Sequence, residues 1–149
     1  MEMPREILFR AKRWKQYDKN ESWTYGVPLI NYLCECEMHS DCLVRLVYPE
    51  TVGQFTGFTD KNGVKVFEGD IVRYNESFCS PRKGVICFGD YKDSSGDMPY
   101  HRGFFVQWLN DPLIRKELVF WTSERDIEVI GNIHENPELL EGKNNEQHR

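Results

Sequence analysis

The residues best suited to bind a metal ion lie together between Cys34 and Cys42. This stretch, CECEMHSDC, contains three cysteines and one histidine, and thiolate and imidazole are ligands of tetrahedral zinc. The spacing argues against a metal, because structural zinc sites usually draw their ligands from two separated pairs. We therefore expect a reduced hairpin tip rather than a zinc site or a labile disulfide, and no cofactor. The four candidate ligands are Cys34, Cys36, His39 and Cys42.

No other cluster of residues indicates a reaction centre. The sequence contains no motif of the zinc proteases, P-loop NTPases, dinucleotide-binding proteins or α/β-hydrolases. The cysteines Cys79 and Cys87 and the histidines His101 and His134 have no catalytic partner at a recognisable spacing. We therefore expect that the protein is not an enzyme.

A locally basic segment offers a different activity. Basic and aromatic residues are interleaved in RAKRWKQYDK, and such a pattern can hold single-stranded nucleic acid by charge and stacking. The net charge of −5 opposes this interpretation, because nucleic-acid-binding domains usually carry a basic excess. The other interpretation is an exposed, solvated hairpin end. The residues that would contact nucleic acid are Arg10, Lys12, Arg13, Trp14 and Lys15.

Aromatic residues in the second half of the chain could form a shallow recognition surface. The same residues could instead pack in the core or against a second subunit, since aromatic side chains dominate both environments. The candidates for protein interaction are Tyr74, Tyr91, Tyr100, Trp108 and Trp121.

Short strands separated by turns dominate the sequence and predict a mainly β fold. Hairpins are expected in the N-terminal part, including one with arms Gln54–Thr59 and Val64–Phe67. The dipeptide Asn62-Gly63 favours its turn because both residues tolerate positive φ. Five further strands in meander order predict a small SH3-like barrel. These strands are Asp70–Tyr74, Gly84–Gly89, Phe104–Leu109, Glu117–Thr122 and Ile127–Ile133.

Little helix is expected. Pro49 and Gly53 suit the start and stop of a single helical turn, residues 123–126 suit a 3₁₀ turn, and Asn136 is expected to cap a short C-terminal helix. The polar loop between Asp90 and Arg102 is expected to be a mobile functional loop. The predicted parts are an N-terminal hairpin region (1–63), the barrel (64–134), and a short helix with a frayed tail (135–149), together forming one compact unit.

Composition limits the class of protein. The 149 residues are 40% hydrophobic and 29% charged, which is ordinary for a soluble globular domain. The N-terminus has charges where a secretory signal needs an apolar run, and no apolar stretch is long enough to span a bilayer. We therefore expect a cytoplasmic protein without a membrane partner, whose five cysteines stay reduced.

Three blocks of sequence resemble the YopX-like family of phage and prophage proteins. They are REILFRA (Arg5–Ala11), PETVGQFTGFTDKNGVKVFEGDIV (Pro49–Val72) and IEVIGNIHENPELL (Ile127–Leu140), in the family's order. The resemblance implies a phage or prophage protein inside a bacterial cell, a β-rich fold with an SH3-like barrel, and self-association. It brings no established activity and no catalytic residues.

These observations support three hypotheses. The first is a non-enzymatic phage accessory protein that self-associates into a homo-oligomer or binds a host or phage protein. The second is a nucleic-acid-binding module that uses the hairpin Arg10–Lys19. The third is an enzyme or a metal protein built on the cysteine-rich stretch.

Overall fold

The computed structural model describes residues 5–75, 81–92, 100–109, 116–123 and 127–141. These residues form two compact units. Unit 1 comprises Met1–Phe58 and Lys65–Glu68, and unit 2 comprises Thr59–Val64 and Gly69–Arg149. The prediction of a mainly β chain is confirmed. The division at 63/64 and 134/135 stays a prediction.

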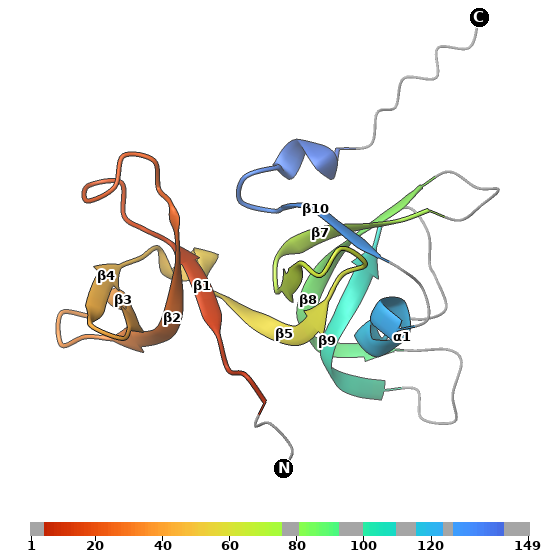
Figure 1. Cartoon of the computed structure of the whole chain (residues 1–149), viewed down its shortest axis with the longest axis horizontal. Helices are drawn as coiled ribbons and strands as arrows, with labels where there is room; N and C mark the ends of the chain where they lie inside the picture. Colours follow the sequence, from red (N-terminus) through yellow and green to blue (C-terminus); the bar gives the residue numbers. More distant parts are fainter. Residues whose placement is uncertain (1–4, 76–80, 93–99, 110–115, 124–126, 142–149) are drawn as a thin grey trace, which may run out of the picture. The chain divides into compact units, whose positions relative to one another are not determined.

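Unit 1 contains a six-stranded antiparallel sheet in the order β4-β3-β2-β1-β5-β6 (Figure 1). Strand β2 changes its pairing partner halfway, because residues up to Gly26 pair with β1 and residues from Val27 onwards pair with β3. Pro28 therefore lies where β1 has ended and its missing N–H removes no bond to β1. The strands are β1 (Phe9–Lys12), β2 (Trp23–Ile30), β3 (Cys36–Ser40), β4 (Leu43–Leu46), β5 (Gly53–Thr59) and β6 (Lys65–Phe67).

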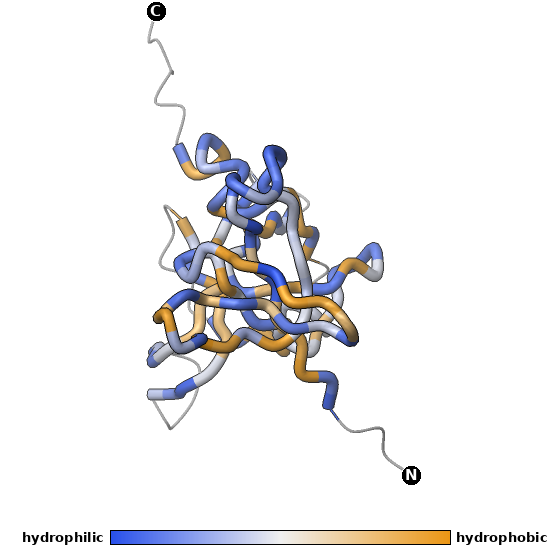
Figure 2. The backbone as a smooth tube through the Cα atoms, turned by 90° about the vertical axis from the view of Figure 1, so that its left-hand side faces the viewer, coloured by the Kyte–Doolittle hydropathy of each residue, from blue (hydrophilic) through white to orange (hydrophobic). Residues whose placement is uncertain are grey.

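Strands β1 to β4 curl until their two ends meet. Val47, which follows β4, forms an antiparallel bridge with Arg13, which follows β1, and Trp14 N donates to Leu46 O over 3.0 Å. The core inside this curl consists of Ala11, Cys36, Met38 and Val47, with Phe9 and Val52 packed against it. Hydrophobic and hydrophilic stretches alternate over short distances along the tube in Figure 2, as short strands with one buried face require.

The helical turn expected after this curl is confirmed as the 3₁₀ helix η1 (Pro49–Thr51). The buried Thr51 holds it against β1, because its Oγ1 accepts a bond from Lys12 N over 2.8 Å and donates to Tyr48 O over 2.7 Å.

The hairpin of β5 and β6 is confirmed, but its turn differs from the prediction. Among the turn residues, Gly63 has a φ of 80° and Asn62 does not adopt positive φ. Asp60 organises the turn, since its Oδ1 accepts bonds from Asn62 N over 2.8 Å and from Val64 N over 2.9 Å. Its Oδ2 accepts a bond from Val129 N over 3.0 Å. The carboxylate thus joins the tip to the strand of unit 2 that contains Val129.

Unit 2 contains a four-stranded antiparallel sheet in the order β10-β7-β8-β9 (Figure 1). The strands are β7 (Asp70–Tyr74), β8 (Arg82–Lys92), β9 (Tyr100–Trp108) and β10 (Glu128–Asn132). Among the described residues, its buried apolar side chains come from the sheet, from the short helix α1 (Leu118–Ser123), and from Ile127, which precedes β10. They are Ile71, Val72, Ile86, Val106, Trp108, Leu118, Trp121 and Ile127.

The predicted barrel strand Glu117–Thr122 is wrong, because this segment forms α1. Only Glu117 takes part in sheet pairing, through an isolated bridge to Phe105. The helix buries Leu118 and Trp121, three residues apart, and leaves Val119 41% exposed. Packing of this helical pair overrides the β propensity of the local residues.

The C-terminal helix is the 3₁₀ turn η2 (Pro137–Leu139). Asn136 was expected to cap this turn, but its side chain makes no capping hydrogen bond. Its Oδ1 accepts a bond from Asn132 N over 3.3 Å instead. Several other predictions lie outside the described residues. They concern Cys79, the centre of the predicted loop (93–99), most of the predicted turn (124–126) and the C-terminal tail (142–149).

Candidate interaction surface

Strand pairing places six side chains on the outer face of β2, β3 and β4. They form two rows that each cross three strands, and we call them the β2–β4 face: Val27, His39 and Val44; Leu29, Glu37 and Leu46. The alternate residues of β3, Cys36 and Met38, are buried in the core of unit 1. Because side chains alternate along a strand, the six therefore face outwards.

The two outer strands of this face present apolar side chains to solvent. Val27 and Leu29 on β2 are 49% and 51% exposed, and Val44 on β4 is 57% exposed. The adjoining turn adds Tyr32 and Leu33, which are 92% and 60% exposed. Exposed apolar side chains that gather on one face mark interaction sites more often than singly scattered ones.

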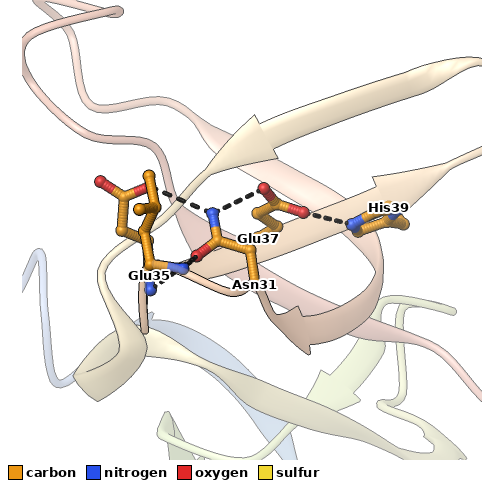
Figure 3. A network of polar contacts seen from close by, with 5 residues as sticks. Asn31, Glu35, Glu37 and His39 are labelled. Atoms are coloured by element: carbon orange, nitrogen blue, oxygen red, sulfur yellow. Dashed lines mark hydrogen bonds and ion pairs between the residues drawn. The ribbon is translucent and has the colours of Figure 1, made fainter.

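Strand β3 and the turn before it carry a hydrogen-bonded line of polar groups instead (Figure 3). Asn31 Nδ2 donates to Glu35 Oε2 over 3.1 Å and to Glu37 Oε1 over 2.8 Å. The other carboxylate oxygen of Glu37 lies 2.7 Å from His39 Nε2. The amide of Asn31 is itself fixed, because its Oδ1 accepts bonds from Leu33 N and Glu35 N.

This line of contacts keeps a negative charge on the face. The hydrogen bond from Asn31, followed by that from His39, holds the pKa of Glu37 below its usual value. A carboxylate that accepts such bonds stays ionised at neutral pH. The face therefore combines an acidic centre with two apolar columns, of which Val27, Leu29 and Val44 are exposed and Leu46 is half-buried.

The comparisons with known proteins identify the family but no activity. Residues 6–141 match the family described as YopX protein. The chain belongs to the YopX protein family. The crystal structure of protein EF1440 from Enterococcus faecalis is similar to it, with 25% sequence identity and a TM-score of 0.50 over 91% of this chain and 99% of that chain. None of the curated proteins matches the chain. No helix in the described part of this YopX-family chain is long and apolar enough to cross a membrane.

His39 makes its side-chain contact with a carboxylate. A carboxylate that orients an imidazole also occurs in hydrolases, where the second ring nitrogen lies within reach of a nucleophile. Within the described ranges, the ring of His39 is hydrogen bonded to Glu37 and to no hydroxyl or thiol. The Glu37–His39 pair thus satisfies polar groups on an open sheet.

The prediction that the cysteine-rich stretch forms a hairpin tip is wrong. Cys36 and His39 lie in strand β3, Cys34 lies in the preceding turn with a φ of 62°, and Cys42 lies in the following turn. Cys36 is buried, whereas the other two cysteines are exposed. No three His, Cys, Asp or Glu side chains among the described residues are placed to hold a metal ion.

The basic residues proposed for nucleic acid make contacts within unit 1. The guanidinium of Arg10 lies 4.5 Å from the ring centroid of Trp23, and Arg10 is only 9% exposed. Lys12 Nζ lies 4.9 Å from the same ring, and Arg13 forms an ion pair with Asp18 at 3.1 Å. Because these cationic groups already contact an aromatic ring or a carboxylate, they are less available to bind the phosphate groups of a nucleic acid.

The other two members of that set behave differently. Trp14 Nε1 donates to Val47 O over 2.8 Å, and its ring stacks on Tyr17 with centroids 6.4 Å apart. Lys15 is exposed, and its backbone N donates to Tyr48 Oη. Nucleic-acid binding through these residues stays a prediction.

The predicted aromatic surface separates into a packed group and an exposed one. Trp108 and Trp121 are each 4% exposed, and their ring centroids lie 4.7 Å apart. Tyr74 contacts Trp121 edge-on at 5.2 Å. These three rings pack within unit 2, whereas Tyr100 is 73% exposed.

The remaining tyrosine belongs to a ladder of rings on β8 and β9. Tyr91 stacks on His101 at 5.3 Å and on Phe105 at 5.1 Å. Between these residues Gly89 lies directly opposite Gly103. Aromatic rings that lean over a glycine pair cover backbone that no Cβ shields, so this ladder stabilises the two-stranded ribbon.

Sequence reasoning missed the β2–β4 face. The signal was the run Val27–Ile30, in which apolar residues occupy both faces of a strand. Such a run indicates a strand covered on both sides, and here its outward residues remain exposed.

Proposed function

We propose that the chain is a non-enzymatic interaction module, encoded by a phage or prophage and acting inside the bacterial host, that binds a protein through the β2–β4 face. The observation that carries this proposal is the exposure of three apolar side chains on this face, Val27 and Leu29 on β2 and Val44 on β4. Their removal from water would favour association. The phage origin rests on the family resemblance.

The experiment compares proteins captured from induced host cells by the wild type and by matched variants. Val44→Asp and Val27→Asp place a charge on the face. Val64→Asp makes the same change at a side chain of similar exposure, 48%, in the β5–β6 turn. The proposal predicts a protein held by the wild type and by Val64→Asp but lost from both face variants. Equal capture by all four chains would contradict it.

The partner could also be a second copy of the chain. Size-exclusion chromatography with light scattering measures this directly. A homo-oligomer that Val44→Asp dissociates and Val64→Asp preserves would place self-association on the β2–β4 face. An oligomer indifferent to Val44→Asp would place the subunit contact elsewhere.

A further inference from the structure

We infer, building on the proposed function, that the β2–β4 face recognises an amphipathic helix of another protein whose apolar side is interrupted by a lysine or arginine. The apolar columns supply the area to be buried, and the acidic centre selects the residue between them. The inference therefore names the chemistry of the partner rather than its identity.

The charge of the face selects a cation. Glu35 and Glu37 lie on the central line, and Asn31 and His39 occupy part of their hydrogen-bonding capacity. A carboxylate offers about four lone-pair positions, so each retains room for a further donor. A wholly apolar partner would desolvate these carboxylates without compensation, which is costly. A lysine or arginine would complete their hydrogen bonds.

The width of the face suits a helix. The columns on β2 and β4 are separated by β3, hence by two strand spacings or about 9.6 Å. An α-helix with its side chains is about 10–12 Å across, so one helix can contact both columns while its central side chain lies over β3. Exposed apolar side chains occur on both sides of the central line, at Val27, Leu29 and Val44.

A second copy of the same face fits less well. Face-to-face contact between two copies would place four carboxylates, from Glu35 and Glu37 of each chain, beside two His39 rings. Like charges brought together at an interface oppose association. A cationic helix meets no such opposition.

The test uses three synthetic helical peptides of about 18 residues. Each carries a leucine stripe, and the central residue of the stripe is lysine, glutamate or leucine. Fluorescence anisotropy measures their binding to the full chain, to Val44→Asp, to the control Val64→Asp, and to the double variant Glu35→Gln/Glu37→Gln.

The wild type should bind the lysine peptide about tenfold more tightly than the glutamate peptide. The double glutamine variant should reduce this ratio to about twofold. Val44→Asp should abolish binding, and Val64→Asp should change neither the affinity nor the ratio. Equal affinity for the lysine and glutamate peptides, tightest binding of the leucine peptide, or no binding at all would overturn the inference. If the face variants still lose a protein that the wild type captures, the proposed function survives such a result. If they do not, both the proposed function and this inference fail.

Discussion

At the scale of single residues, Asp60 organises the β5–β6 turn and connects it to β10. Its carboxylate accepts two backbone N–H groups of its own turn and a third from Val129. It is 6% exposed, so water cannot replace these bonds easily. The two turn bonds are local, whereas the bond to Val129 spans 69 positions and requires the fold.

Replacing Asp60 should therefore destabilise unit 2. Asp60→Ala removes the acceptor of three partly buried N–H groups, and we predict a loss of about 1–3 kcal/mol in the free energy of unfolding. Asp60→Asn should cost less, because one oxygen remains. Urea denaturation measures both, with the exposed Asp41→Asn as the control, expected within about 0.5 kcal/mol of the wild type. A stable Asp60→Ala protein would contradict this role.

The carboxylates of Asp18, Glu37 and Glu128 should make the fold sensitive to acid. The pKa of each carboxyl is lowered in the folded state, chiefly by a side-chain hydrogen bond. The donors are Ser22 for Asp18, Asn31 for Glu37 and Arg73 for Glu128. Stability from a lowered carboxyl pKa is complete above the unfolded value, about 3.9 for an aspartate and about 4.3 for a glutamate, and is lost as the pH falls through the folded value.

We therefore expect the melting temperature to fall as the pH is lowered from about 5 to about 3. Glu128→Gln should melt below the wild type at neutral pH, and the two curves should converge in acid. Thermal melts across this pH range measure the difference. A constant difference between the curves would show that the ion pair with Arg73 does not cause the pH dependence.

Cys36 provides a reporter of unit 1. Burial, and secondarily the charge of Glu37, raises the pKa of its thiol, and the thiolate is the reactive form. We predict that iodoacetamide modifies the exposed Cys34 and Cys42 at least about tenfold faster than Cys36 in native buffer. Peptide mapping by mass spectrometry measures each rate, and urea should remove the difference. Equal native rates would contradict the burial of Cys36.

At the scale of elements, sequence patterns predicted strands better than they predicted α1. Alternation along a strand is local, and β7 lies where the pattern placed it, at Asp70–Tyr74. The segment Leu118–Ser123 contains strand-favouring residues, and its helix follows from packing Leu118 and Trp121 on the same side. That packing depends on Trp108, which lies outside the segment.

The corner of β2 should tolerate no side chain at Gly26. A Cβ there would lie 2.1 Å from the carbonyl oxygen of His39, so β2 and β3 would have to separate. We predict that Gly26→Ala lowers the free energy of unfolding by about 1–3 kcal/mol and speeds modification of Cys36. Val27→Ala, one position along, should change stability by less than about 0.5 kcal/mol. Wild-type stability of Gly26→Ala would contradict the close approach.

At the scale of the whole molecule, the sequence predicted a β-rich chain of the correct family but not its candidate site. The β2–β4 face joins residues from three strands, and it exists only once Val27, His39 and Val44 lie side by side. Pairing register cannot be read from a single strand. The cysteines could be named as candidates from residue type alone, whereas the face is defined by strand pairing and exposure.

Hydrogen exchange of the full chain with saturating lysine-centred peptide shows whether the β2–β4 face is the binding surface. Added protection is expected in residues 27–46, absent from Val44→Asp and retained in Val64→Asp. Protection confined to unit 2, or none in the wild type, would contradict the assignment of the β2–β4 face as the binding surface.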